Sequence, residues 1–96
     1  MLNGKRRGYL RGQANKLNPI VQIGKEGISQ GLVEQTLKAL EDHELVKGRV
    51  LNNSSVDARE AANELAEKCE AEVIQVIGNV FVLFKRNNEN PVYILP

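Results

Sequence analysis

The sequence has few of the residues that disulfides, metal sites and membrane spans require. It has one cysteine and one histidine, Cys69 and His43, so no intramolecular disulfide forms and structural zinc lacks its usual ligands. Its longest apolar run, residues 80–84, is far shorter than the roughly 20 residues of a membrane-spanning helix. No signal-peptide pattern follows the basic start. We therefore expect a cytoplasmic protein with no membrane partner, no metal and no cofactor.

Net charge is also nearly absent, but the average hides an uneven distribution. Thirteen basic residues oppose 12 acidic ones, for a formal charge of +1. Residues 1–25 contain six basic and no acidic residues, whereas residues 57–72 contain two basic and six acidic ones. This separation indicates a dipolar surface with one side suited to a polyanion. With only 96 residues, we expect one domain, 1–96, without room for a large catalytic pocket.

Hydrophobic periodicity predicts three helices and four strands. The helices are expected over residues 5–17, 29–42 and 57–70, and the strands over 19–23, 45–51, 72–77 and 80–86. The last two strands are joined by Gly78-Asn79, which suits a tight hairpin, and their apolar runs indicate central strands. The order α-β-α-β-α-β-β predicts an α/β fold with a four-stranded mixed sheet and helices packed on it. Residues 91–96 are expected to add a short edge strand at most.

The first predicted helix carries most of the basic charge. Leu10 lies on its apolar stripe, and Gly8 and Gly12 lie opposite, so that the outward face is bare backbone. Four cations flank that face: Lys5, Arg7, Arg11 and Lys16. A solvated surface and a polyanion-binding surface explain this pattern about equally well. Tyr9 is the aromatic residue best placed to contact a base, because Phe81 and Phe84 are expected in the core on opposite faces of their strand.

Gly24-Lys25-Glu26-Gly27 follows the first predicted strand and precedes a helix with Ser29 as its N-cap. Two glycines allow a sharp turn and a close approach of phosphate to the backbone, beside the amides of a helix N-terminus. The spacing alone is weak evidence, because most such loops are plain turns, and it lacks the longer form typical of nucleotide hydrolysis. The carboxylate of Glu26 opposes phosphate unless it points away. Since the basic helix leads into this loop through one strand, we expect both to contribute to one surface.

Other chemical groups have simpler interpretations. Lys47 and Arg49 share one face of their strand and are interpreted first as edge residues that prevent aggregation. His43 is expected at a helix end without a catalytic task, a small hydrolase being the remote alternative, and Cys69 is expected to be buried. The acidic helix, 57–70, is a solvated face or a docking surface for a basic ribosomal protein.

The assembled motifs resemble those of the CRM (chloroplast RNA splicing and ribosome maturation) domain family, in its stand-alone bacterial YhbY form. The resemblance rests on Leu10-Arg11-Gly12, residues 18–27, His43-Glu44-Leu45-Val46-Lys47, Ile77-Gly78 and Val82-Leu83-Phe84-Lys85. It implies a compact domain similar to the C-terminal domain of bacterial translation initiation factor three. It also implies RNA binding, with the glycine loop contacting RNA, and an association with precursors of the large ribosomal subunit.

The sequence thus favours a non-enzymatic, monomeric RNA-binding protein that acts on ribosomal RNA during subunit assembly. The predicted RNA-binding residues are Gly24, Lys25, Glu26, Gly27, Lys5, Arg7, Arg11 and Lys16. The alternative is a protein-interaction module that docks a basic ribosomal protein through the acidic helix.

Overall fold

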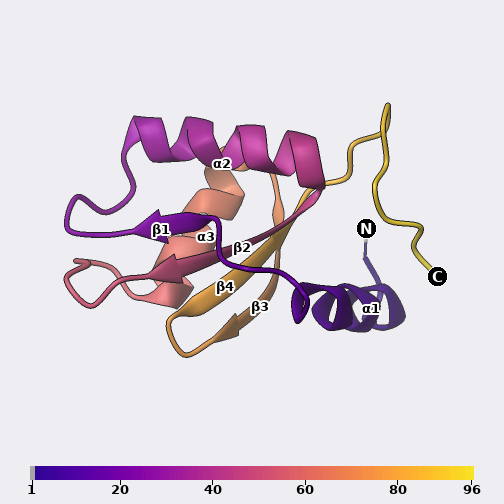
Figure 1. Cartoon of the computed structure of the whole chain (residues 1–96), viewed down its shortest axis with the longest axis horizontal. Coiled ribbons are helices and arrows are strands. Elements are labelled where there is room, and N and C mark those ends of the chain that lie inside the picture. Colours follow the sequence, from indigo (N-terminus) through magenta and orange to yellow (C-terminus); the bar gives the residue numbers. More distant parts are fainter. Residues whose placement is uncertain (1) are drawn as a thin grey trace.

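The computed structural model describes residues 2–96, which form one α/β domain (Figure 1). The elements are α1 (Gly4–Ala14), β1 (Val21–Ile23), α2 (Gln30–His43), β2 (Leu45–Val50), α3 (Ala58–Cys69), β3 (Glu72–Ile77) and β4 (Val80–Phe84). The strand order is β1-β2-β4-β3, with β1 parallel to β2 and the other pairs antiparallel. The predicted order of elements, the hairpin and the mixed four-stranded sheet are confirmed.

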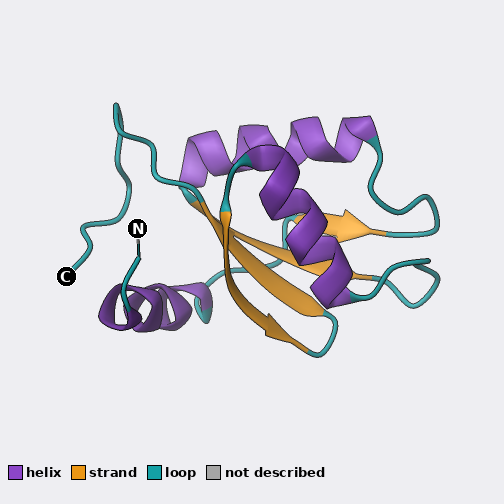
Figure 2. Cartoon of the chain, turned by 180° about the vertical axis from the view of Figure 1, so that it is seen from behind, coloured by secondary structure: helices purple, strands orange, loops and turns teal. Residues whose placement is uncertain are grey.

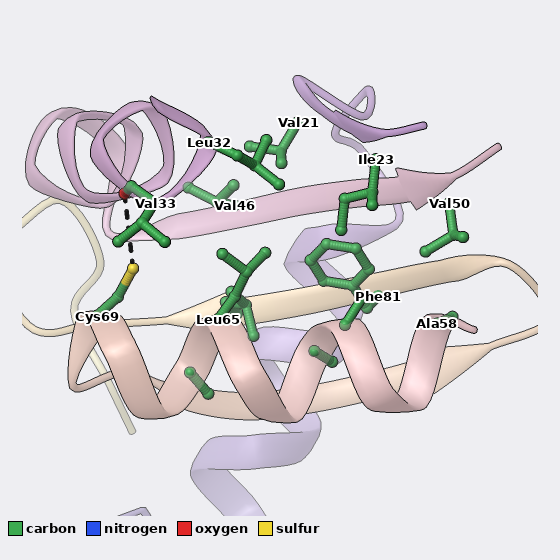
Figure 3. Packing of buried hydrophobic residues seen from close by; sticks show 14 of the residues in the cluster. Val21, Ile23, Leu32, Val33, Val46, Val50, Ala58, Leu65, Cys69 and Phe81 are labelled. Atoms are coloured by element: carbon green, nitrogen blue, oxygen red, sulfur yellow. Dashed lines mark hydrogen bonds between the residues drawn. The ribbon is translucent and has the colours of Figure 1, made fainter. Parts of the chain in front are cut away.

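Helices α2 and α3 cover one face of the sheet and enclose the larger core (Figures 2 and 3). The inward residues of α3 are mostly alanine, which allows the helix to lie close to the strands. Phe81 is completely buried between this helix and the sheet. Cys69 is buried as predicted, and its Sγ donates to the carbonyl of Val33 at 3.8 Å.

Helix α1 packs on the opposite face and covers only one end of it (Figure 1). Its buried residues, Leu10 and Ala14, contact Leu45 and Phe84, which point to this side of the sheet. Phe81 and Phe84 therefore lie on opposite faces, as the alternation of the strand predicts. The uncovered remainder of this face is called the open face; it is formed by Gln22, Lys47, Arg49, Gln75, Ile77 and Val80.

The first helix is shorter than predicted. It ends at Ala14, where the amides of Lys16 and Leu17 donate to the carbonyls of Gln13 and Ala14 and close the last turn. These hydrogen bonds join residues three apart instead of four, so the α-helical pattern stops before Asn18, the residue whose backbone Pro19 restricts. Lys16 therefore lies in the link to β1 and not on the helix.

Two predictions about strand position are wrong. Lys47 and Arg49 are not edge residues, because β2 is hydrogen-bonded on both sides, to β1 and β4. Strand β3, expected to be central, is an edge strand paired with β4 alone. Its apolar residues are covered by α3 on one side and by α1 at one end of the other, which explains the misleading apolar run.

The C-terminal segment 87–96 forms no strand and is held to the domain by Glu44. This side chain is completely buried and accepts hydrogen bonds from the amides of Asn87 (2.7 Å), Val92 (2.7 Å) and Tyr93 (2.9 Å). The Arg86 guanidinium lies 3.2 Å from the same carboxylate. Glu44 has φ of 64°, in the region that favours glycine. Its four partners offset that backbone strain.

Candidate nucleic-acid interface

The glycine loop is a closed turn at the end of β1. The amide of Gly27 donates to the carbonyl of Gly24 at 3.1 Å. Gly27 has φ of 68°, a backbone conformation that residues with a side chain rarely adopt. Lys25 and Glu26 occupy the corners of the turn and are exposed. Ser29 caps α2 as predicted, since its hydroxyl accepts from the amide of Leu32 at 3.2 Å. The loop thus presents backbone, the ammonium group of Lys25 and the carboxylate of Glu26 to solvent.

A second loop, 51–56, lies beside the glycine loop (Figure 1). A Cβ added at Gly24 would lie 3.7 Å from Oδ1 of Asn53, and one added at Gly27 would lie 3.4 Å from Oγ of Ser55. Because the two glycines have no side chains, the side-chain oxygens of Asn53 and Ser55 lie directly beside the backbone of the turn. Sequence reasoning missed Asn53 and Ser55. The available signal was the helix predicted between the first two strands, because a helical crossover joins parallel strands and parallel strands end at the same edge of a sheet.

The predicted cations of the first helix divide into exposed and engaged groups. Lys5, Arg11 and Lys16 are exposed. Arg7 is partly buried, and its guanidinium donates to the carbonyl of Val73, which ties α1 to the edge strand. Arg7 therefore has a structural contact in addition to its predicted role at the surface.

The glycine loop and α1 do not lie side by side. They occupy opposite ends of a molecule whose longest dimension is 38 Å, with β1 between them (Figures 1 and 2). The two candidate features therefore lie at separate ends of the molecule, and a surface shared by both has to extend across the part of the chain between them.

The open face connects those two ends. Arg49 lies next to Gln22 on β1 and Val80 on β4. Lys47, two residues earlier on β2, points to the same face and lies closer to α1. A shallow hollow of about 230 Å³ beside Lys47 is also lined by Asn15 and Ile77. The residues that define this face include two cations and no carboxylate. Lys47 and Arg49, first interpreted as edge residues, are thus the cations best placed to bridge the loop and the helix.

The acidic helix α3 lies on the other side of the sheet (Figure 2). Glu60 and Glu67 are exposed there, and Glu64 forms an ion pair with Lys68 at 3.0 Å. The exposed carboxylates of α3 therefore lie on the side of the sheet opposite the open face.

The groups that a hydrolase would use are not assembled. His43 is exposed at the end of α2, whereas the neighbouring Glu44 carboxylate turns inward and binds the C-terminal segment. Burial raises the pKa of the Cys69 thiol, which disfavours the nucleophilic thiolate, although Lys85 acts in the opposite direction. Within residues 2–96, no three His, Cys, Asp or Glu side chains are grouped to hold a metal ion. In the same range, every helix is too short or too polar to cross a membrane.

Three similar proteins are described in similar terms, and the solved structure of one of them shares this fold. The chain is 40% identical over 96 residues, the whole of both chains, to the probable RNA-binding protein YqeI of Bacillus subtilis. It is 31% identical over 88 residues to an RNA-binding protein of Haemophilus influenzae, covering 92% of this chain and 89% of the relative. The solution structure of a Staphylococcus aureus protein, described as a candidate RNA-binding protein, superposes with a TM-score of 0.82 at 42% identity over the full length of both chains.

These relatives are named as RNA-binding proteins and not as enzymes. The model of the CRS1/YhbY (CRM) domain matches residues 2–85, which include α1, the glycine loop and all four strands. The match covers nearly the whole chain, as the motifs in the sequence predict. The chain belongs to the CRS1/YhbY (CRM) domain family.

Proposed function

We propose that this protein is a non-catalytic RNA-binding protein whose contact surface runs from the glycine loop across the open face to the exposed cations of the N-terminal part. Its RNA is ribosomal RNA of the large-subunit precursor, bound during assembly by a cytoplasmic monomer. The names of the relatives support RNA binding. The ribosomal target rests on the resemblance to the bacterial members of the family.

The observation that carries the proposal is the distribution of cations on one side of the sheet. Lys25 lies in the glycine loop, Lys47 and Arg49 cross the open face, and Lys16 and Arg11 lie at the α1 end. None of these five side chains forms an ion pair with another residue of the described chain, 2–96. They are therefore available to neutralise phosphates, which supply most of the affinity in this class of interface.

The glycine loop adds a place where phosphate approaches the backbone. Gly24 and Gly27 carry no side chain between the turn and the neighbouring loop, so a phosphate meets main-chain atoms, Lys25 and the polar groups of Asn53 and Ser55. Such contacts position an RNA but do not read its sequence. Specificity then comes from the shape of the RNA or from unpaired bases.

The salt dependence of RNA binding tests the phosphate contacts. We expect the logarithm of the binding constant to fall linearly with the logarithm of salt concentration, by about 0.7 for each contacted phosphate of single-stranded RNA. The variant Lys25→Glu with Arg11→Glu should bind more weakly and with a smaller slope.

A matched control keeps the change in net charge and moves it away from the proposed surface. Lys38→Glu with Arg59→Glu reverses two exposed cations on α2 and α3. This control should change the affinity much less than the loop and helix variant. Equal losses in both variants, or a flat salt dependence of the wild type, would contradict the proposed surface.

Crosslinking in cells, followed by sequencing of the bound RNA, tests the ribosomal target. We expect enrichment of the large-subunit precursor over mature ribosomal RNA and messenger RNA, and loss of that enrichment in the Lys25→Glu, Arg11→Glu variant. Binding spread over messenger RNA would reject the ribosomal target and leave RNA binding itself intact.

A further inference from the structure

A hollow of about 320 Å³ lies where the link between α1 and β1 meets the C-terminal segment. Its lining comes from the link, the end of α2, β2 and residues 92–93, which are brought together only by the fold. Its volume is at the lower end of the roughly 300–1,000 Å³ typical of small-ligand sites. The hollow lies at the end of β1 opposite the glycine loop.

The charged side chains that line this hollow are both basic, Lys16 and Lys47, and no carboxylate lines it. His43 lines it as well. Two larger hollows, of about 480 and 560 Å³, both have glutamates in their walls. Nζ of Lys47 donates to the carbonyl of Leu17 at 3.2 Å, which holds the ammonium group at the hollow and leaves two of its three donors for a ligand. This hollow therefore suits an anionic group.

The rest of the wall is apolar. Ile20 and Val92 both line it and are 48% and 53% exposed, unusually high for large aliphatic side chains. Tyr93 adds a partly buried ring, and its backbone is fixed by the hydrogen bond from its amide to Glu44. A ligand that fits both parts of the hollow has one flat or apolar portion and one anionic portion.

We propose that this hollow binds one unpaired nucleotide of the RNA. The base lies against Ile20, Val92 and Tyr93, and the phosphate lies at Lys16 and Lys47. This inference rests on the proposed function and adds a base-binding site to it. A base stacked within a duplex cannot enter such a hollow, so the site selects single-stranded or bulged RNA.

The test compares two RNA probes that differ only in their bases. One is a single-stranded oligouridylate of about ten nucleotides, within the roughly 4–16 nucleotides that small single-strand-binding folds cover. The other is an abasic oligomer of the same length. For the full chain carrying Ile20→Ser and Val92→Ser, we expect about five- to tenfold weaker binding of oligouridylate than for the wild type. Binding of the abasic oligomer should be unchanged.

The control is Ile94→Ser, which removes an aliphatic side chain that is 91% exposed on the same segment but does not line the hollow. It should leave both affinities within about twofold of the wild type, a change of at most about 0.4 kcal/mol. Thermal unfolding of all variants checks that they remain folded. Addition of uridine monophosphate to the wild type should shift the backbone amide resonances of Ile20, His43 and Val92.

The outcomes separate the nucleotide site from the proposed function. Suppose that the wild type binds both probes. If the double serine variant then keeps its affinity for both, or loses affinity for both equally, the nucleotide site is rejected and phosphate binding stands. If an acidic peptide, and not uridine monophosphate, shifts the amides around the hollow, the site serves a protein partner and the inference is likewise rejected. If the wild type binds neither probe, the nucleotide site is rejected, and the proposed function fails as well if the large-subunit precursor RNA is also not bound.

Discussion

Gly48 on β2 is paired with Phe81 on β4, and the ring of Phe81 occupies the space where a side chain at position 48 would lie. A Cβ at Gly48 would be 2.6 Å from Cε2 of that ring. Neighbouring residues of a strand point to opposite faces of the sheet. Gly48 faces the core and makes room for Phe81, so Lys47 and Arg49 on either side of it lie on the open face. Packing on one side of the sheet thus fixes the cations on the other side.

We expect Gly48→Ala to lower the free energy of unfolding by about 1–3 kcal/mol, because the ring or the strand must move to accommodate the added methyl group. Urea denaturation measures this change. Gly12→Ala is the control: nothing lies within 4 Å of its added Cβ, and alanine in an exposed helix should stabilise by up to about 1 kcal/mol. Similar effects of the two substitutions would contradict the close contact with Phe81.

Much of this fold was predictable because it depends on neighbours in the chain. The Ser29 cap of α2, the Gly78-Asn79 turn and the burial of Cys69 follow from local residue types and periodicity. The end of α1 at Ala14 was less predictable, because it depends on the backbone hydrogen bonds of the last turn and lies four residues before Asn18, which Pro19 restricts.

The remainder depends on strand order, which local patterns do not determine. Lys47 and Arg49 look like edge residues until β1 and β4 are known to flank β2. In the same way, Lys25 and Arg11 appear close in the sequence, but β1 places them at opposite ends of the molecule. The continuous basic surface therefore becomes visible only when the open face is assembled between them.

The buried Glu44 should be important for stability. In Glu44→Gln, one carboxylate oxygen becomes an NH₂ group, which cannot accept a hydrogen bond. At Oε1 this change removes the acceptor of the Val92 and Tyr93 amides, and at Oε2 it removes the acceptor of the Asn87 amide. We expect the free energy of unfolding to fall by about 1.5–3 kcal/mol, the range for a hydrogen bond to a charged group. Urea denaturation at neutral pH measures this change. Glu41→Gln, at an exposed position near the end of α2, should have almost no effect, and an equal loss there would contradict the buried network.

The same carboxylate predicts a dependence on pH. Burial raises the pKa of Glu44, but the amides of Asn87, Tyr93 and Val92 and the charge of Arg86 outweigh it, so that the pKa lies below its ordinary value of 4.5. A lowered folded-state pKa means that the stabilisation is complete above the unfolded-state value and is lost as the pH falls through the folded-state value. In urea titrations at several pH values, the difference in the free energy of unfolding between wild type and Glu44→Gln should stay constant above about pH 5 and shrink below the ordinary pKa of 4.5. A difference that grows on acidification would contradict this assignment.

The open face should contribute to RNA affinity through charge. In Lys47→Ala with Arg49→Ala, the removal of two phosphate contacts should reduce the slope of log binding constant against log salt by about 1.4 for single-stranded RNA. Filter binding or fluorescence anisotropy over a range of salt concentrations measures it. Arg59→Ala with Lys68→Ala removes two exposed cations from α3 and should leave the slope nearly unchanged. A slope unaffected by the open-face substitutions would restrict RNA contact to the two ends of the molecule.

The acidic helix distinguishes RNA binding from the alternative of a protein-docking module. Reversing Glu60, Glu64 and Glu67 to lysine changes the charge on the side of the sheet opposite the open face. At an ionic strength of about 0.1 M, charges farther apart than about 10 Å are largely screened, so we expect RNA affinity to change by less than about twofold. Cosedimentation with ribosomal particles should also persist if RNA alone mediates the association. Loss of cosedimentation with full RNA affinity would instead identify α3 as the surface that docks a basic ribosomal protein.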